Sequence, residues 1–551
     1  MNKKINFVIV IFILAISIFL RLWSLGSVPP SPDWDEAALG YNAYSLMETG
    51  RDEYGKFLPI ILRSFDDYKP ALYAYLTIPF VAIFGVSTVA VRFPSAIFGI
   101  LTVLAVYLLV KELLRLKSKT DSQNYNFLPM LSSFLLAISP WHIQFSRIAF
   151  ESNVGLAFNV FGVLFFIYGL KKPIFLTISA TFMGLALYVY QSEKVFTPIL
   201  FLLLIFVFRK NIFEISKKYL LLALVVGAII IFPIANYTFT NEDALSRAKG
   251  VSVFSSDNQF TDDAAVRNIF NKEKNDYLGM LFDNRRVLYA KSMLDNYLSH
   301  YNFYWLFLAG DQPRHHAPEM GLMYLWELPF LLVGIYALIF GKFDKRFKLL
   351  IFGWFLIAPI PAAFTTGVPH AVRTLNFLPT FQVFIAIGII AVLQKILNLS
   401  IKYLIFIFSI LFLIFNFSYY INQYFVQQNY FHSEAWQYGY KEAVSEIKSI
   451  EHKYGKIIVS NKPHLDQSYI FFLFYLRYPP NIYQKESIDV SGGFRENHFF
   501  GKYEFRPIEW ESEKKNNNLF VGRAEDFPKG INVIKRINFL NNKPAILIVE
   551  G

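Results

Sequence analysis

The sequence predicts an all-α, polytopic membrane protein of about 11 transmembrane helices with a small α/β domain at its C-terminal end. Hydrophobic residues make up 54% of the 551 residues and charged residues only 17%, below the roughly 25% that is usual in soluble domains. Apolar runs long enough to cross a bilayer recur along about the first 425 residues. After them the chain becomes polar and aromatic, with short strand-like runs.

The first apolar run, in MNKKINFVIVIFILAISIFLRLW, predicts an uncleaved transmembrane helix. It is longer than a typical signal-peptide core, and no A-x-A-like cleavage site follows it. Lys3 and Lys4 place the N-terminus in the cytoplasm by the positive-inside rule. The segment 26–87 is therefore expected to be the first external loop.

The apolar stretch 70–85, PALYAYLTIPFVAIFG, is ambiguous because it is short for a span and contains Pro70 and Pro79. If it crossed the membrane, every later basic cluster would change sides. If it lies along the outer interface, all of these clusters fall inside. We therefore expect an interfacial segment. The predicted spans are 5–25, 88–112, 127–145, 153–170, 173–190, 195–209, 218–236, 321–340, 347–365, 372–395 and 402–421.

The charge and cysteine content exclude several classes of protein. Lys and Arg number 53 against 41 Asp and Glu, which gives a net charge of +12. These cations stand in short clusters between apolar runs, which is the membrane pattern, so no nucleic-acid partner is expected. The chain has no Cys, which excludes disulfides, thiolate nucleophiles and Cys-ligated metals.

The tail, 423–551, is predicted to be an α/β domain outside the membrane, following the transmembrane domain at 1–422. A helical pattern fills 433–453. Strand-like runs occur at 456–460, 469–476, 518–522 and 545–550. The long segment 237–320 is the other large external loop. No internal repeat is evident, which weakens an inverted-repeat transporter interpretation.

The segment SPDWDEAALG concentrates acids at the start of the first external loop. Asp33 and Glu36 fit a capping box, with Asp33 as the N-cap of a helix that runs to about Met47, and Gly50 fits the C-cap. Asp35 is only compatible with the helix dipole. It is therefore the acid that local structure does not require.

Further charged residues lie at the predicted outer ends of spans, where the positive-inside bias disfavours cations. Lys69 stands just before Pro70, where a snorkelling anchor is the ordinary explanation. Arg92 begins the second span, and His370 and Arg373 lie one helical turn apart near the tenth. A cation in or near the membrane is a functional candidate by default.

Three outer segments supply weaker candidates. Arg147 and Glu151 stand four residues apart, a spacing that also suits an exposed ion pair. Tyr190 belongs to YVYQSEKV, for which a plain polar turn is the simpler explanation. Arg247 and Lys249 could contact a phosphate, but a solvated loop fits them better.

Four segments, in their order and spacing, resemble the GT-C membrane glycosyltransferases. The nearest branch is glycosyltransferase family 39, with the protein O-mannosyltransferases and bacterial aminoarabinose transferases. The resemblance covers roughly residues 5–240 and extends loosely over the remaining spans. It implies a fold with a long first external loop and two interfacial helices. The segments are PDWDEAALGYNAYSL, YKPALYAYLTIPFVAIFG, VAVRFPSAIFGILTVLAVYLL and LAISPWHIQFSRIAFESN.

The resemblance implies an inverting transfer of a sugar from a polyprenyl-phosphate donor to an acceptor hydroxyl on the outer face. Asp35 matches the catalytic acid, with Glu36 beside it in the Asp-Glu pair, and Lys69 matches the Lys-Pro position that would bind the donor phosphate. An attacking hydroxyl must lose its proton, which a carboxylate can accept, and cations stabilise the leaving phosphate. The further residues implied are Arg92, Arg373 and His370 toward the phosphate, and Glu151, Arg147 and Tyr190 in the acceptor cavity.

The partners that the resemblance implies are a polyprenyl-phosphate sugar, membrane lipids, and an acceptor that is a protein, a lipid or a polysaccharide. The expected location is the plasma (inner) membrane, with the site and the tail outside the cytoplasm. His315, His316 and Glu319 have a spacing that suits weak metal binding, but two adjacent His are a poor ligand signal. We therefore expect no metal and no other cofactor.

Two other functions are compatible with a polytopic chain. A flippase or transporter for lipid-linked sugars would want charges at mid-membrane depth and broken helices, whereas the charges here gather at the outer ends. A non-catalytic sensor or scaffold would lack the set formed by Asp35, Lys69 and Arg92, and the set is intact.

The topology predicts the location of a reporter fused after Lys119. Because the stretch 70–85 is expected not to cross the membrane, the reporter should be cytoplasmic, as measured by paired alkaline phosphatase and green fluorescent protein fusions. An external reporter would mean that 70–85 spans the bilayer.

Overall fold

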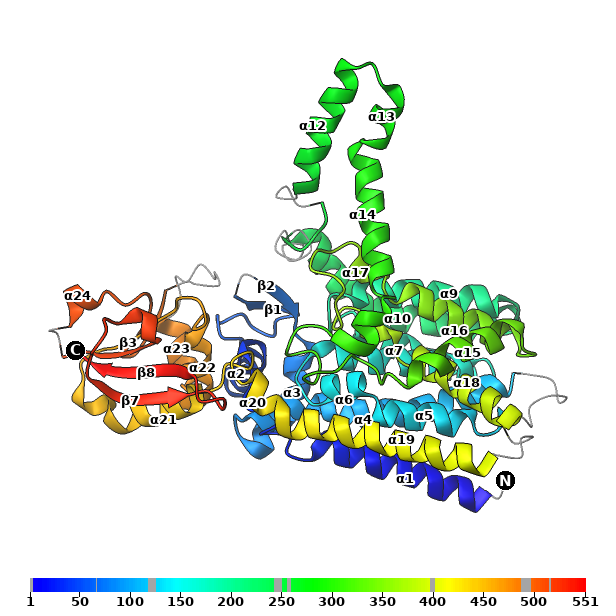
Figure 1. Ribbon diagram of the computed structural model, residues 1–551, viewed down its shortest axis with the longest axis horizontal. Coiled ribbons are helices and arrows are strands. Elements are labelled where there is room, and N and C mark those ends of the chain that lie inside the picture. The colour runs from blue at the N-terminus through cyan, green and yellow to red at the C-terminus, as the bar shows by residue number, and fades with distance from the viewer. Residues whose placement is uncertain are drawn as a thin grey trace.

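Long apolar helices lie side by side and form the body of the protein (Figure 1). The computed structural model describes residues 3–65, 67–116, 125–241, 250–254, 259–396, 402–486, 497–514 and 517–551. Within these residues, eight helical stretches are long and apolar enough to cross a membrane. They are α1 (Lys3–Leu22), α4 (Thr88–Leu114), α7 (Glu151–Gly169), α9 (Glu193–Phe213), α10 (Lys217–Thr240), α16 with α17 (Lys345–Ile357, Ile360–Ala363), η4 with α18 (Leu375–Phe377, Thr380–Ile396), and α19 with η5 and α20 (Lys402–Asn422, Gln423–Gln427, Gln428–His432).

The other three predicted spans contain shorter apolar helices. These are α5 (Leu128–Ile138), which continues into α6 (Pro140–Ser146), then α8 (Phe175–Ala186) and α15 (Glu327–Phe340). At 1.5 Å per residue, helices of this length reach about 17–21 Å, short of a hydrocarbon core of about 30 Å. Ser139 separates α5 from α6 because its backbone is extended and its side chain caps α6. The predicted class, a polytopic helical membrane protein with a C-terminal α/β region, is confirmed.

The first loop folds into α2 (Trp34–Thr49), the antiparallel strands β1 (Ile61–Ser64) and β2 (Asp67–Pro70), and α3 (Leu72–Phe84). The predicted capping box is confirmed: Asp33 accepts from the Glu36 N–H, and Glu36 accepts from the Asp33 N–H. α2 ends at Thr49, two residues beyond the predicted end, and Gly50 is its C-cap at φ 68°, as predicted. The 13-residue α3 is about 20 Å long. Its interfacial position stays a prediction.

The tail forms a six-stranded sheet in the order β4-β5-β3-β6-β8-β7. The central strand β3 is parallel to both of its neighbours, and the outer pairs are antiparallel. The strands are β3 (Ile457–Val459), β4 (His498–Phe500), β5 (Tyr503–Phe505), β6 (Leu519–Gly522), β7 (Val533–Asn538) and β8 (Pro544–Glu550). The accompanying helical segments are α21 (Tyr440–Ile450), η6 (Glu451–Lys453), α22 (Ser468–Leu476), α23 (Pro480–Glu486), α24 (Trp510–Glu513) and η7 (Ala524–Asp526).

The prediction of a strand for the run YIFFLFYL at 469–476 is wrong, because this run forms the helix α22. Residues 468–474 are all buried, so the run has no exposed face to reveal its period. The predicted helix 433–453 begins later, at Tyr440, after Gly439 with φ 115°. The strands expected at 456–460, 518–522 and 545–550 are confirmed as β3, β6 and β8.

The sheet domain packs on the first loop, at the end of the bundle opposite the N-terminus (Figure 1). Tyr41 donates to the Tyr478 carbonyl at 3.1 Å, and Gln484 donates to Ser45 at 2.9 Å. At Gly40, α2 approaches α22 so closely that an added Cβ would lie 2.5 Å from the Phe474 ring. Two segments more than 400 residues apart therefore form one interface.

The predicted loop 237–320 contains a helical arm that stands out from the bundle (Figure 1). It is built from α12 (Gln259–Glu273), α13 (Tyr277–Phe282) and α14 (Arg285–Ser299), followed by the π-helix η3 (Trp305–Ala309). Asn296 ties its base to the bundle through the Ala363 and Thr365 carbonyls, at 3.2 and 3.0 Å. Arg247 and Lys249, considered as phosphate contacts, and Lys119 lie outside the described residues.

A buried acid, Glu53, closes the loop after α2. Its N–H donates to the Asn42 side-chain oxygen at 3.0 Å, and the Asn42 amide donates back to a Glu53 carboxyl oxygen at 3.2 Å. Burial raises the pKa of Glu53 to about 8. The folded protein therefore holds a proton that the unfolded chain releases above about pH 4.5.

The unfolding temperature should consequently fall as the pH rises from about 5 to 8, since the unfolded state binds fewer protons in that window. Glu53→Gln keeps the neutral shape and should flatten this part of the profile. Scanning calorimetry in detergent across pH 5–9 measures both. An identical slope in the variant would show that another group carries the dependence.

Candidate functional site

Asp35 pairs with Lys69, and this pair is partly open to solvent. The Lys69 ammonium donates to an Asp35 carboxylate oxygen, and the side chains are 10% and 23% exposed respectively. Lys69 is held in β2 opposite Leu62 of β1. Gln191 braces the same strand by donating to the Tyr68 carbonyl at 2.8 Å. Asp35 and Lys69, both predicted as site residues, are therefore in contact within the first loop.

Glu36 and Arg92, also predicted as site residues, lie in an enclosed ion pair. The Arg92 Nε and Nη2 donate to the two Glu36 oxygens at 2.9 and 2.8 Å, and both side chains are essentially unexposed. Glu36 also accepts from the Ala149 N–H at 2.8 Å. The remaining Arg92 donors go to the carbonyls of Leu25, Pro29 and Ser31, at 3.0, 2.9 and 2.7 Å.

This arrangement differs from the expectation of a phosphate ligand and a second catalytic acid. The guanidinium of Arg92 makes five hydrogen bonds and presents no surface to a ligand. A charge taken out of water needs this degree of pairing, because its desolvation is costly. In this structure the pair anchors the start of α2 to α4.

The residues predicted for the acceptor cavity are likewise buried. Arg147 is 0% exposed and donates to the carbonyls of Leu20 and Val28, at 2.8 and 2.9 Å. Glu151 is 4% exposed at the first turn of α7, and Tyr190 is 8% exposed. The alternative of an exposed pair between Arg147 and Glu151 is wrong, because neither side chain reaches the surface.

Arg314 is a neighbour of the site that sequence reasoning missed. Its Nη1 donates to Asp33 Oδ2 at 2.6 Å, and its guanidinium carbon lies 4.7 Å from the centre of the Trp34 ring. Burial raises the pKa of Asp33 to about 6, and the positive charge of Arg314 opposes that rise. The partners are 281 residues apart, so no local pattern could have linked them.

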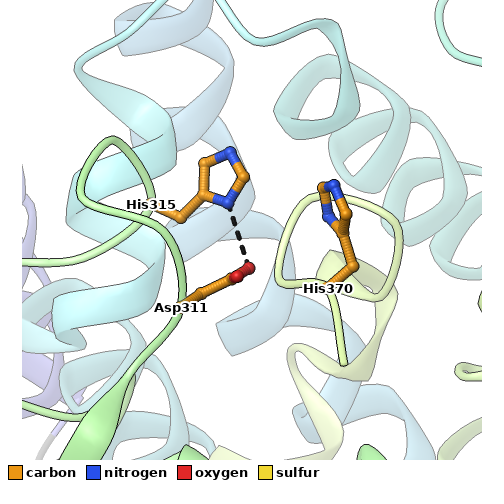
Figure 2. A group of neighbouring side chains, drawn as sticks. All are labelled: Asp311, His315 and His370. Carbon is orange, nitrogen blue, oxygen red and sulfur yellow. Dashed lines mark hydrogen bonds and ion pairs between the residues drawn. The ribbon is translucent and has the colours of Figure 1, made fainter. Parts of the chain in front are cut away.

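His370 and Arg373 occupy different surroundings at the turn before α18. The Arg373 guanidinium donates to Thr365 Oγ1 and the Thr366 carbonyl, at 2.6 and 2.7 Å, and is partly exposed. His370 instead lies beside Asp311 and His315, and Figure 2 shows the three side chains converging.

The sequence suggested His315, His316 and Glu319 as possible metal ligands, but the structure does not bring these three side chains into one group. The His316 ring nitrogen lies 2.7 Å from the Ala317 carbonyl, and its ring faces His432. Glu319 is held at φ 52° in a turn. Only His315 of the original set joins the cluster with Asp311 and His370.

A cavity of about 620 Å³ opens between the start of α2 and the sheet domain. Its walls combine aromatic rings with side chains of both charges, and they include Arg314 and Trp34, the residue before Asp35. The other lining residues with rings or charges include Tyr438, Tyr440, Phe539, Glu434, Asp466, His464 and Arg523.

Comparison with a family model adds a match over part of the chain. Residues 68–237 match the model for dolichyl-phosphate-mannose-protein mannosyltransferase. The matched segment includes Lys69 and Arg92 but ends before Arg373. No curated protein matches the sequence.

Solved structures show the fold over most of the chain. ArnT from Cupriavidus metallidurans, in a crystal structure bound to undecaprenyl phosphate, is similar with a TM-score of 0.54 and 10% identity, over 98% of this chain and 97% of that one. AglB from Archaeoglobus fulgidus, an oligosaccharyltransferase in complex with an inhibitory peptide and a dolichol-phosphate, gives 0.51 and 13%, over 95% and 70%. The apo A. fulgidus oligosaccharyltransferase gives 0.50 and 14% over 86% of this chain, which spans 64% of its length.

These likenesses confirm the expected GT-C fold of membrane glycosyltransferases. Together with the long apolar helices, these likenesses indicate that the chain is an integral membrane protein. The roles of individual site residues stay predictions.

The two acids of the Asp-Glu pair should differ in what they do for stability. Glu36→Gln leaves the buried Arg92 without its counter-charge and should lower the free energy of unfolding by about 3–5 kcal/mol. Asp35→Asn breaks a partly exposed pair and should cost at most about 1 kcal/mol. Denaturant melts in detergent measure both.

Glu48→Gln, at an exposed acid on the same helix, is the matched control and should leave stability unchanged. An equal loss of stability for the Asp35 and Glu36 variants would contradict the expectation that Glu36, and not Asp35, stabilises the fold.

Proposed function

We propose that this chain transfers a sugar from a polyprenyl-phosphate-linked donor to an acceptor hydroxyl, with inversion at the anomeric carbon and Asp35 as general base. The observation that carries the proposal is the partly exposed ion pair between Asp35 and Lys69 in the first loop. The GT-C fold and the mannosyltransferase family match support the reaction class. Neighbours of the same fold were solved with undecaprenyl phosphate and with a dolichol-phosphate.

The pair provides both groups that such a transfer needs. The acceptor oxygen forms a bond to the anomeric carbon, the bond from that carbon to the phosphate oxygen breaks, and the hydroxyl proton passes to the Asp35 carboxylate. Lys69 is within contact of Asp35 and can turn to the phosphate of an incoming donor. When Lys69 turns to the phosphate, its charge neutralises the leaving group. The Asp35 carboxylate then becomes available to the acceptor hydroxyl.

Arg373 is our second candidate for the donor phosphate, because its guanidinium is partly exposed at the turn before α18. Arg92 is not proposed for that role, since Glu36 and three carbonyls already take its donors. Two cations of different reach, an ammonium and a fork-shaped guanidinium, suit a phosphate that must be held and then released.

The acceptor is proposed to enter through the cavity of about 620 Å³ beside Trp34. Aromatic faces with flanking charges of both signs suit a polar, ring-containing or peptide-like group better than a bare acyl chain. Protein, lipid and polysaccharide acceptors all satisfy this description.

We place the reaction on the outer face of the plasma membrane. The basic N-terminus lies at one end of the bundle, and the first loop and the sheet domain lie at the other (Figure 1). A cytoplasmic N-terminus therefore puts Asp35 and the cavity outside.

Asp35→Asn should lower the rate of transfer by about 10²–10⁴-fold, because the amide cannot accept the proton. Mass spectrometry of outer-surface glycans and lipids, in cells with the wild type, the variant or no protein, measures the product. The purified variant should still be stabilised against heat by undecaprenyl phosphate.

Glu48→Gln, on the exposed side of the same helix, should retain the full product. Full product with Asp35→Asn would overturn the assignment of the base. An unchanged glycan and lipid profile on loss of the whole protein would overturn the proposed transferase itself.

A further inference from the structure

The segment that follows the arm returns to the bundle and meets the turn before α18. Asp311 and His315 lie four residues apart in a non-helical turn of this returning segment, and His370 belongs to the turn before α18. Figure 2 shows the Asp311 carboxylate between the two imidazoles. The side chains of Asp311 and His315 are only 6% and 5% exposed.

One oxygen or nitrogen from each of these residues lies within 4.8 Å of the others. The His315 Nδ1 and an Asp311 oxygen are 3.0 Å apart. The edge of a tetrahedral site with bonds of about 2.0 Å is about 3.3 Å, so this separation already suits a shared ion. The third group, His370, lies within 4.8 Å of the other two.

Outer contacts hold two of the three groups in place. The Ala371 N–H donates to Asp311 Oδ2 at 2.6 Å. The backbone N–H of His370 donates to His300 Nε2 at 3.2 Å, and the other His300 ring nitrogen lies 2.7 Å from the Asn296 carbonyl. Metal sites use such second contacts to orient the ligands.

The ring of His315 lies among aromatic side chains. The rings of Phe145 and Phe150 pack on His315 at centroid distances of 5.8 and 5.6 Å. These contacts hold the ring beside Asp311.

We propose that Asp311, His315 and His370 bind one divalent transition-metal ion, with Zn²⁺ as the ion that the donor set fits best. Two imidazoles and one carboxylate form a set that Zn²⁺ accepts readily, with a water in the fourth position. Mg²⁺ and Ca²⁺ prefer oxygen ligands throughout. The proposal does not depend on the sugar transfer proposed above.

The ion would cross-link the segment that lines the acceptor cavity at Gln312, Pro313 and Arg314 to the turn before α18. Arg314, the residue before His315, reaches Asp33 and the Trp34 ring. Fixing His315 to the turn at His370 therefore fixes the position from which Arg314 contacts the start of α2. The ion acts here as a clip that holds one wall of the cavity.

The test uses the full-length protein, purified in detergent, stripped with a chelator and dialysed against Zn²⁺. Mass spectrometry of the metal should find one tightly held ion per chain. The unfolding temperature should rise on Zn²⁺ addition, and Co²⁺ in its place should give the visible absorption of a tetrahedral N/O site. Less than a tenth of an ion per chain, with no thermal shift, would overturn the proposal.

His315→Gln and His370→Gln should each lose the bound ion and the Zn²⁺-dependent thermal shift. His316→Gln is the matched control, since its ring lies next to the cluster in sequence but turns toward Ala317 and His432, and it should bind as the wild type does. Unchanged binding in both cluster variants would overturn the site. The Co²⁺ spectrum of the wild type decides the question even where a variant fails to fold.

Discussion

The bidentate pair between Glu36 and Arg92 is the constraint on which the rest of the site depends. It draws the first turn of α2 onto α4 and takes in the Ala149 N–H, so three separate segments share one carboxylate. With Glu36 turned inward at N3, the preceding residue on the helix projects elsewhere, and Asp35 meets Lys69 at the partly open face. Adjacent acids thus receive opposite environments from a single helix turn.

Much of the fold follows from local pattern, and much of the site does not. Apolar length and charge clusters predict the bundle, the capping box predicts the start of α2, and short strand-like apolar runs predict β3, β6 and β8. The helix α22 defeats the pattern because it is apolar on every side. Glu36 forms the capping box that the local pattern predicts, but its pairing with Arg92, 56 residues away, could not be read from that pattern.

The cluster of Asp311, His315 and His370 shows the same limit more sharply. From the sequence, His316 and Glu319 were as good as any partner for His315, since spacing was the only criterion. The structure brings Asp311 to His315 through a non-helical turn, and it brings His370 to both through the return of a distant turn to the same place. Composition and periodicity carry no information about that encounter, because it depends on how the arm and α18 are joined to the bundle.

The packing of α22 and α23 on α2 has a consequence for the order of events during synthesis. Ser45 is made long before its partner Gln484, which follows 439 residues later. At about 5–20 residues per second, that interval is on the order of 20 to 90 seconds. Until the sheet domain has been synthesised, the cavity beside Trp34 lacks the lining residues that this domain supplies. A premature stop before α22 would leave the Tyr41 side of α2 without its contact to Tyr478, a form that quality-control proteases can recognise.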